Sequence, residues 1–179
     1  MNEGNIRREF YQMLRYRFNL WPDHFPDIPG VKSQPGRPDL VVLHPDGLGF
    51  YIEVKALNLS KFKSFAFGNI ADGQRKWLSK WEEARPHGSW LGLGTHGVRP
   101  REMFLVPWDT WLSIEDQVTH YQNSLPYVAG PGFSTGLQAN KLDFSLLTPF
   151  KLVRIPPKDR LAGESGWTIP FLDGNEWTL

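Results

Sequence analysis

The residues best suited to chemistry lie in the segment GRPDLVVLHPDGLGFYIEVK, which holds a Pro-Asp pair ending at Asp39 and a triplet from Glu53 to Lys55. Two carboxylates that converge on one point repel each other unless a cation lies between them, and their oxygens favour a hard ion such as Mg²⁺ or Mn²⁺. Such an ion lowers the pKa of a bound water and stabilises charge on a reacting phosphate. A lysine ammonium can position that water or stabilise the phosphorane. Asp39, Glu53 and Lys55 are therefore candidates for metal-dependent phosphodiester hydrolysis.

Two strands must bring these residues together. Residues 40–43 form a short apolar run, residues 49–57 a longer one, and His-Pro-Asp-Gly between them is a turn signal, so we expect an antiparallel hairpin. Alternate side chains of a strand share a face, which makes Glu53 and Lys55 neighbours. The hairpin would also bring Asp39 beside them. For an isolated Glu-x-Lys the alternative is the solvated face of a half-buried strand, but the preceding Pro-Asp favours a site.

The remaining elements suggest one compact domain. The chain has 179 residues, of which 40% are hydrophobic, enough for one core. The proline-rich segment WPDHFPDIPG is too broken to be helical and is expected to be a connection. We expect a core over residues 1–123 and a Pro/Gly-rich extension over 124–179, packed on the core or on a dimer partner. Helices are predicted at 3–18, 70–85 and 109–123, the last with Asp109 as N-cap, and further strands at 89–95, 103–106 and 150–155.

Composition narrows the class of protein. The chain has no cysteine, which excludes disulfides and thiolate metal sites. It also has no apolar run of the roughly 18 residues that a spanning helix needs and no apolar leader, so we expect a soluble cytoplasmic protein. Residues 1–101 hold 15 Lys and Arg against 10 Asp and Glu, whereas residues 102–179 hold 5 against 9. The basic half suits a polyanionic ligand, although an ordinary solvated surface would also explain it.

These motifs resemble a known family. Pro38-Asp39 followed by Glu53-Val54-Lys55 resembles the signature of the PD-(D/E)XK nuclease superfamily. The segment SFAFGNIADGQRKWLSKW at residues 64–81 is similar to the stretch in RecU/Hjc-type Holliday junction resolvases where a phenylalanine-containing loop leads into a helix bearing a glutamine. The resemblance covers residues 3–115. It implies an α/β fold with a restriction-endonuclease-like core (α-β-β-β-α-β), in which helices flank a central mixed sheet.

The resemblance also assigns roles around the metal. It implies that Asp39, Glu53 and the backbone carbonyl of Val54 bind Mg²⁺, for which Mn²⁺ substitutes. Gln74 matches the family's ancillary polar residue, and it shares a helical face with Trp77, Leu78 and Trp81 that should turn inward. The family places a glutamate on the first helix as well. Two residues compete for that position, and we prefer Glu3, which lies on the apolar stripe, to Glu9, which lies about a quarter-turn away from it.

Basic and aromatic residues flank these motifs. Basic side chains of this kind bind phosphates without reading sequence, or else belong to an ordinary hydrated surface. Three phenylalanines at positions 62, 65 and 67 could form a wedge, a dimer contact or part of the core. The candidate DNA-binding residues are Arg37, Lys61, Lys63, Arg75, Lys76 and Lys80.

Two other patterns are set aside. Residues 92–97 spell GxGxxG after a strand, but Pro100 follows where a helix would have to hold a pyrophosphate, so we expect no nucleotide cofactor. The five histidines show no zinc spacing.

The leading hypothesis is a Mg²⁺-dependent endodeoxyribonuclease that acts as a homodimer on four-way DNA junctions, since a two-fold symmetric substrate that needs paired nicks suits a C₂ dimer. The alternatives are a restriction, repair or replication-repair nuclease on the same core, and a DNA-binding module that does not cut. The resolvase pattern has no counterpart for the proline-rich loop before Pro38 or for the acidic C-terminal part.

Overall fold

A computed structural model describes residues 3–24, 37–44, 49–61, 65–97, 99–124, 141–142 and 144–170. The main elements are α1 (Glu3–Arg17), β1 (Trp21–His24), β2 (Leu40–Leu43), β3 (Gly49–Asn58), α2 (Asp72–Ala84), β5 (Ser89–His96), β6 (Met103–Pro107) and α3 (Trp108–Ser124). The shorter elements are β4 (Phe65–Ala66), η1 (Phe67–Asn69), β7 (Lys141–Leu142), η2 (Phe144–Phe150), β8 (Val153–Arg154), η3 (Pro157–Asp159) and β9 (Trp167–Thr168). None of the helices described is long and apolar enough to cross a membrane.

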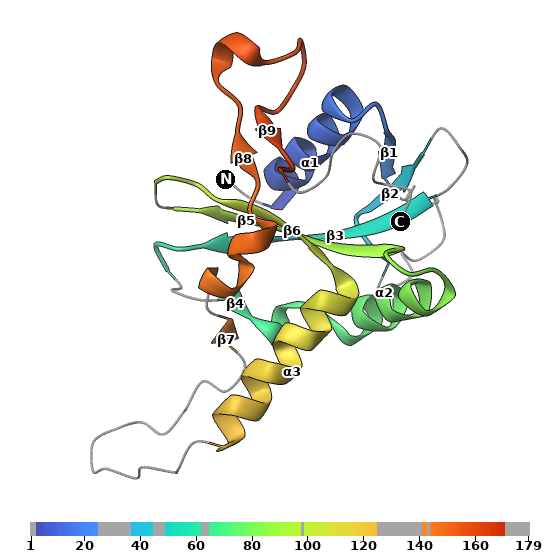
Figure 1. Ribbon diagram of the computed structural model, residues 1–179, viewed down its shortest axis with the longest axis vertical. Coiled ribbons are helices and arrows are strands. Elements are labelled where there is room, and N and C mark those ends of the chain that lie inside the picture. The colour runs from blue at the N-terminus through green and yellow to red at the C-terminus, as the bar shows by residue number, and fades with distance from the viewer. Residues whose placement is uncertain are drawn as a thin grey trace, which may run out of the picture.

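The architecture is a mixed sheet between two helical layers, as the sequence predicts. The sheet has five strands in the order β1-β2-β3-β5-β6, and only the β3–β5 pair is parallel. Helix α1 covers one face together with β8 and β9, whereas α2 and α3 cover the other face (Figure 1). The parallel pair requires a crossover, and α2 supplies it.

The first strand is a correction to the sequence prediction. The expected core has three strands before the second helix, and the sequence predicts the residue ranges of two of them, 40–43 and 49–57. The third is β1, which lies in the segment that we expected to be a connection. It lies at one edge of the sheet, and its pairing partner among the described strands is β2. An edge strand tolerates Pro22, because the missing N–H does not interrupt a ladder on both sides.

Helix α1 follows its predicted apolar stripe. Ile6, Phe10, Met13 and Leu14 of α1 are buried, which confirms the spacing that predicted this helix. Helix α2 ends at Ala84, shortly before Pro86. Helix α3 starts at Trp108, so Asp109 lies within its first turn instead of at the N-cap.

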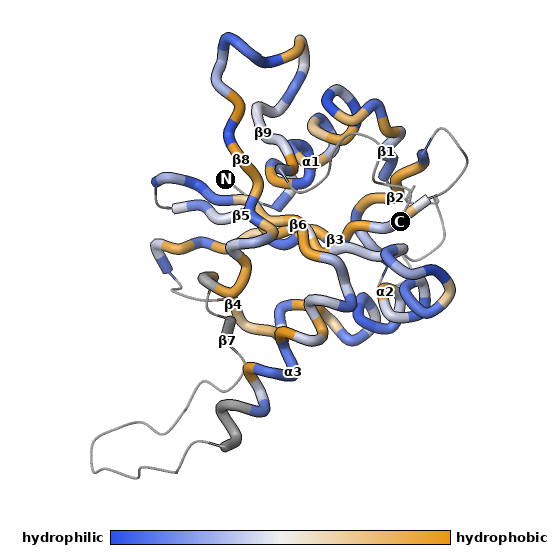
Figure 2. The backbone as a smooth tube through the Cα atoms, viewed as in Figure 1, coloured by the Kyte–Doolittle hydropathy of each residue, from blue (hydrophilic) through white to orange (hydrophobic). Residues whose placement is uncertain are grey.

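Two apolar clusters lie on opposite faces of the sheet. The α1 side is built on Phe50, Ile52 and Val54 of β3, and the α2–α3 side includes Leu78 and Trp111. Hydrophobic residues accordingly concentrate in the central strands, while α2 is largely hydrophilic outside (Figure 2). Phe65 and Phe67 pack edge-on against Trp111 in the second cluster, so of the three roles considered for these phenylalanines the structure shows core packing. Phe62 lies outside the described residues.

The GxGxxG pattern has a packing role. Gly92 and Gly94 lie within β5 and face α1. A Cβ added at Gly92 would lie 2.8 Å from a ring carbon of Phe10, and one added at Gly94 would lie 2.6 Å from Ile6. The absence of these two side chains therefore lets α1 approach the sheet closely.

Gly94→Ala is accordingly expected to lower the free energy of unfolding by about 2 kcal/mol, the usual cost of overpacking a core. Gly68→Ala is the matched control, because no atom lies within 4 Å of a Cβ added there. Its effect should stay within about 0.5 kcal/mol. Urea unfolding of the three proteins measures both changes, and equal stability of the two variants would contradict the close approach of α1.

The described part of the C-terminal extension packs on the core. Leu147 belongs to one apolar cluster, and Leu152, Trp167 and Ile169 belong to the other. The strand predicted over residues 150–155 is shorter than expected. Only β8 forms, paired with β9, and Lys151 makes a single bridge to Phe104 of β6.

Candidate functional site

The β2–β3 hairpin places Asp39 opposite Glu53. Leu40 pairs with Ile52, and continuing this antiparallel register by one residue matches Asp39 with Glu53. Asp39 Oδ2 also accepts a hydrogen bond of 2.9 Å from the Val54 N–H. The predicted pairing is thus confirmed, while the connecting turn at 45–48 lies outside the described residues.

Glu53 is the centre of this arrangement. Its side chain is fully buried, and Lys55 Nζ lies 2.6 Å from Oε1, on the face that the alternation of β3 predicts. Gln74 of α2 donates its Nε2 amide to the same oxygen. The second oxygen, Oε2, is buried and has no hydrogen-bond partner among the described residues. Such an orphaned carboxylate oxygen is costly unless something else binds it.

The start of α2 orients Gln74. Its Oε1 accepts a hydrogen bond of 3.1 Å from the Ala71 N–H, as the N3 residue of a capping box does. With the carbonyl held there, the amide nitrogen points toward β3. Gln74 therefore lies beside Glu53, as predicted from its helical face.

Electrostatics at Glu53 favour a cation. Burial raises the pKa of Glu53 to about 8, with the carboxylates of Asp39 and Glu3 adding to the rise and Lys55 opposing it. A raised carboxyl pKa means that negative charge is under-compensated at this point. The unpartnered Oε2, a second carboxylate on the next strand and the all-oxygen donor set fit a hard divalent ion.

The Val54 carbonyl is the third predicted ligand. The backbone N–H of Val54 reaches Asp39, and the register continues from Asp39 to Pro38 at the position opposite Val54. Proline has no N–H, so it cannot donate a ladder hydrogen bond to the Val54 carbonyl. The Pro-Asp pair thereby ends the β2–β3 ladder at the site.

On the first helix, Glu3 and not Glu9 belongs to this site. Burial raises the pKa of Glu3, Lys55 and Arg7 oppose the rise, and Asp39 adds to it, so its charge interacts with the site. Arg7, one turn along α1, donates from Nη1 to Asp39 Oδ1 at 3.0 Å. The sequence analysis did not identify Arg7, although its i+4 spacing from Glu3 places it on the same side of the helix.

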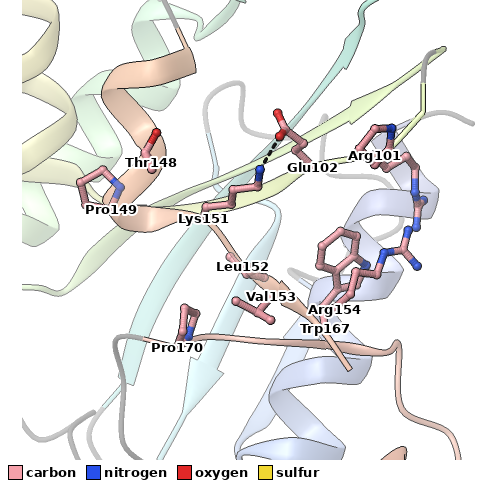
Figure 3. A pocket seen from close by; sticks show the side chains of 11 residues that line it. Arg101, Glu102, Thr148, Pro149, Lys151, Leu152, Val153, Arg154, Trp167 and Pro170 are labelled. Atoms are coloured by element: carbon pink, nitrogen blue, oxygen red, sulfur yellow. Dashed lines mark hydrogen bonds and ion pairs between the residues drawn. The ribbon is translucent and has the colours of Figure 1, made fainter. Parts of the chain in front are cut away.

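Glu9 instead lies near a pocket of about 470 Å³ that is lined by Arg101 and Trp167, among other residues. It accepts hydrogen bonds of 2.8 Å from Arg101 and from the Trp167 indole. In the same pocket Lys151 is paired with Glu102, as Figure 3 shows. Glu9 and Glu102 are each paired with a cation, and among the described residues neither has a buried oxygen without a hydrogen-bond partner, in contrast to Glu53.

One other group of possible metal ligands is closely spaced. Among the residues described, Glu82, His87 and Asp109 form the one group of three or more acidic, His or Cys side chains whose ligand atoms all lie within 4.8 Å of one another. Both Glu82 oxygens already accept backbone N–H bonds, from His87 at 2.6 Å and Ser89 at 3.1 Å. This carboxylate holds the α2–β5 turn, and the cluster was not predicted from sequence. The carboxylate oxygens of Glu3, Asp39 and Glu53 do not all lie within 4.8 Å of one another.

The basic candidates fall into different environments. Arg75 binds Glu115 of α3 through two hydrogen bonds, of 2.7 and 3.0 Å, and also donates to the Phe67 and Ile70 carbonyls. Its guanidinium thus joins α2 to α3, and the phosphate contact of Arg75 stays a prediction. Arg37 is half-buried, Lys61, Lys76 and Lys80 are exposed, and Lys63 lies outside the described residues.

Comparison of the chain with protein-family models, curated proteins and solved structures finds no match. The functional argument therefore depends on the residues and geometry of the site.

Proposed function

We propose that this chain is a metal-dependent DNA endonuclease of the PD-(D/E)XK type, built on a restriction-endonuclease-like core. The observation that supports this most strongly is the setting of Glu53. It is fully buried, one of its oxygens has no hydrogen-bond partner among the residues that the structure describes, and Asp39, just before β2, lies opposite it. An apolar core residue would fill this position at lower cost, so a binding function best explains the buried carboxylate.

The roles follow from position. Asp39, Glu53 and the Val54 carbonyl would hold Mg²⁺ or Mn²⁺, which would supply Lewis-acid stabilisation of the phosphate and activation of water. Lys55 keeps its ammonium next to Glu53, where it stabilises the negative charge that develops on the phosphoryl oxygens. Gln74 fixes the Glu53 carboxylate, and Glu3 adds negative charge from α1.

The substrate that we propose is branched duplex DNA, with four-way junctions as the leading form. Exposed Lys76 and Lys80 on α2, the helix that carries Gln74, suit a polyanion beside the site. A four-way junction has two-fold symmetry and requires two nicks. A homodimer would present the same site twice, at symmetry-related phosphates.

The test is a cleavage assay on synthetic four-way, flapped and linear DNA of matched sequence. We expect cleavage with Mg²⁺ and with Mn²⁺, none in EDTA, and faster cleavage of the four-way substrate. Sedimentation of the protein–junction complex measures whether two chains bind one junction. Failure to cut any of the three substrates with either ion would refute the nuclease proposal, and equal rates on all three would refute the junction preference alone.

A further inference from the structure

Three aromatic side chains form a surface beside the candidate site that metal chemistry does not explain. Tyr51 of β3 lies 4.7 Å from Trp81 and 6.5 Å from Trp77, measured between ring centroids. The two tryptophans stack on each other at 6.5 Å with an interplanar angle of 22°. We call these three residues the aromatic platform. The sequence predicted that both tryptophans turn inward with Gln74, but Trp81 keeps 36% of its surface exposed.

The platform adjoins the candidate site because both are formed by β3 and α2. Tyr51 is two residues before Glu53 on the same face of β3, a separation of about 7 Å along a strand. On α2, residues 74, 77 and 81 follow one another on one side of the helix. The row that places Gln74 over Glu53 therefore continues into Trp77 and Trp81 over Tyr51.

Two exposed lysines flank the tryptophans of the platform. Lys76, Trp77, Lys80 and Trp81, all on α2, line a pocket of about 300 Å³. Both lysines are exposed, and neither forms an ion pair with any other residue that the structure describes. An aromatic surface alone would suit many apolar partners, but one framed by two free ammonium groups suits a ligand that is both flat and anionic.

We propose that the aromatic platform stacks an unpaired nucleobase of DNA, while Lys76 and Lys80 bind the phosphates on either side of that base. Aromatic side chains with basic residues between them are how proteins bind single strands without reading sequence. A base inside a duplex has no free face to stack on a side chain, so the platform favours DNA whose nucleotides are unpaired next to the scissile phosphate, as in a flap, or become unpaired at the branch point of a bound four-way junction. The inference rests on the proposed nuclease function for DNA as the ligand and adds the form of DNA that the site selects.

The test measures binding in EDTA, where no cleavage can contribute. Fluorescence anisotropy compares a single-stranded 12-mer, the same sequence as a duplex, and single strands in which abasic sites replace the bases. Trp81→Ala should weaken single-strand binding about tenfold and leave duplex binding unchanged. Trp81→Phe, which keeps a ring, should retain most of the affinity. Trp21→Ala is the control, because Trp21 is also exposed, at 64%, but lies on the edge strand β1.

The abasic strands separate stacking from phosphate binding. Wild-type protein should lose affinity for them by at least the factor that Trp81→Ala loses on the intact strand, and Trp81→Ala should lose less than the wild type does. Equal loss on duplex and single strand, or wild-type affinity in a folded Trp81→Ala protein, would overturn the inference. Thermal unfolding checks that both Trp81 variants fold. If Trp81→Ala does not fold, the abasic strands still test the inference, because wild-type protein that binds them as tightly as the intact strand would overturn it. If the protein binds single strands through Trp81 but shows no Mg²⁺-dependent cleavage, the nuclease proposal is refuted and the proposal for this binding surface is retained.

Discussion

Lys55→Met is expected to slow DNA cleavage by about 10²–10³-fold, the usual cost of removing one group that stabilises a transition-state charge. The ammonium lies 2.6 Å from Glu53 Oε1 and is 13% exposed, so it is held at the site yet reaches its surface. Methionine preserves the length of the side chain and removes the charge. Because Lys55 is not a proposed ligand, DNA affinity in Ca²⁺ should change by no more than about twofold. Single-turnover cleavage at saturating protein measures the rate separately from binding.

Lys61→Met is the matched control. Lys61 is exposed just beyond β3, so losing its charge should weaken binding slightly and leave the single-turnover rate unchanged. Lys55→Arg should not restore the rate, because a planar guanidinium does not replace a compact ammonium in a confined position. Cleavage by Lys55→Met at the wild-type rate would remove Lys55 from the mechanism. A loss of rate matched by the same loss of DNA affinity would reassign it to phosphate binding.

The parts of the site that the sequence predicted are those fixed by local periodicity. The alternation of β3 places Glu53 and Lys55 on one face, and a short turn restricts where Asp39 lies. The 3.6-residue period places Gln74 on the side of α2 that faces the sheet. The residues placed in this way are at most about fifteen positions apart in the hairpin, or lie within a few turns of one helix. The periodicity of the sequence was therefore sufficient to predict which side chains share a face.

Partners that meet across the fold could not be predicted in this way. Arg75 binds Glu115 forty positions later, and Arg7 binds Asp39 thirty-two positions later. The sequence shows only that Arg75 is basic and close to Gln74, which suggests a phosphate contact. Its half-buried position between α2 and α3 depends on how the two helices pack.

Edge position and close packing are also tertiary properties. Pro22 lies in a strand because β1 is at the edge of the sheet, and no local signal marks an edge. The glycines of β5 match a nucleotide-binding pattern by letter, but α1 packs against them, so their small size serves helix–sheet contact. The aromatic platform likewise requires α2 to lie over β3. The sequence predicted that both tryptophans turn inward, and only the position of Trp81 at the rim leaves it exposed.

The apparent affinity for Mg²⁺ is expected to rise about fifty-fold between pH 6 and pH 8, because Glu53 must lose its proton before it binds a cation. Its pKa of about 8 leaves Glu53 almost wholly protonated at pH 6 and half-ionised at pH 8. Isothermal titration of the protein with MgCl₂ at several pH values measures the affinity. Repeating it at pH 7 in two buffers of different ionisation enthalpy should show about 0.9 proton released per ion bound. An affinity independent of pH over this range would contradict the assignment of Glu53 as a ligand.

The same ionisation makes the metal-free protein less stable at high pH. Because folding raises the pKa of Glu53 from 4.5 to about 8, its stabilising contribution is fully present below pH 4.5 and is lost as the pH rises through 8. Glu53→Gln keeps the shape and cannot ionise, so in EDTA its melting temperature should exceed that of the wild type at pH 8.5 and approach it at pH 5. Adding Mg²⁺ at pH 8.5 should stabilise the wild type and leave Glu53→Gln nearly unchanged, because binding to the folded state alone shifts the equilibrium. Parallel melting curves for the two proteins at every pH would mean that Glu53 does not titrate between pH 5 and 8.5. A buried Glu53 with an ordinary pKa would have its negative charge already compensated by neighbouring groups. The electrostatic argument that Glu53 and Asp39 bind a cation would then fail.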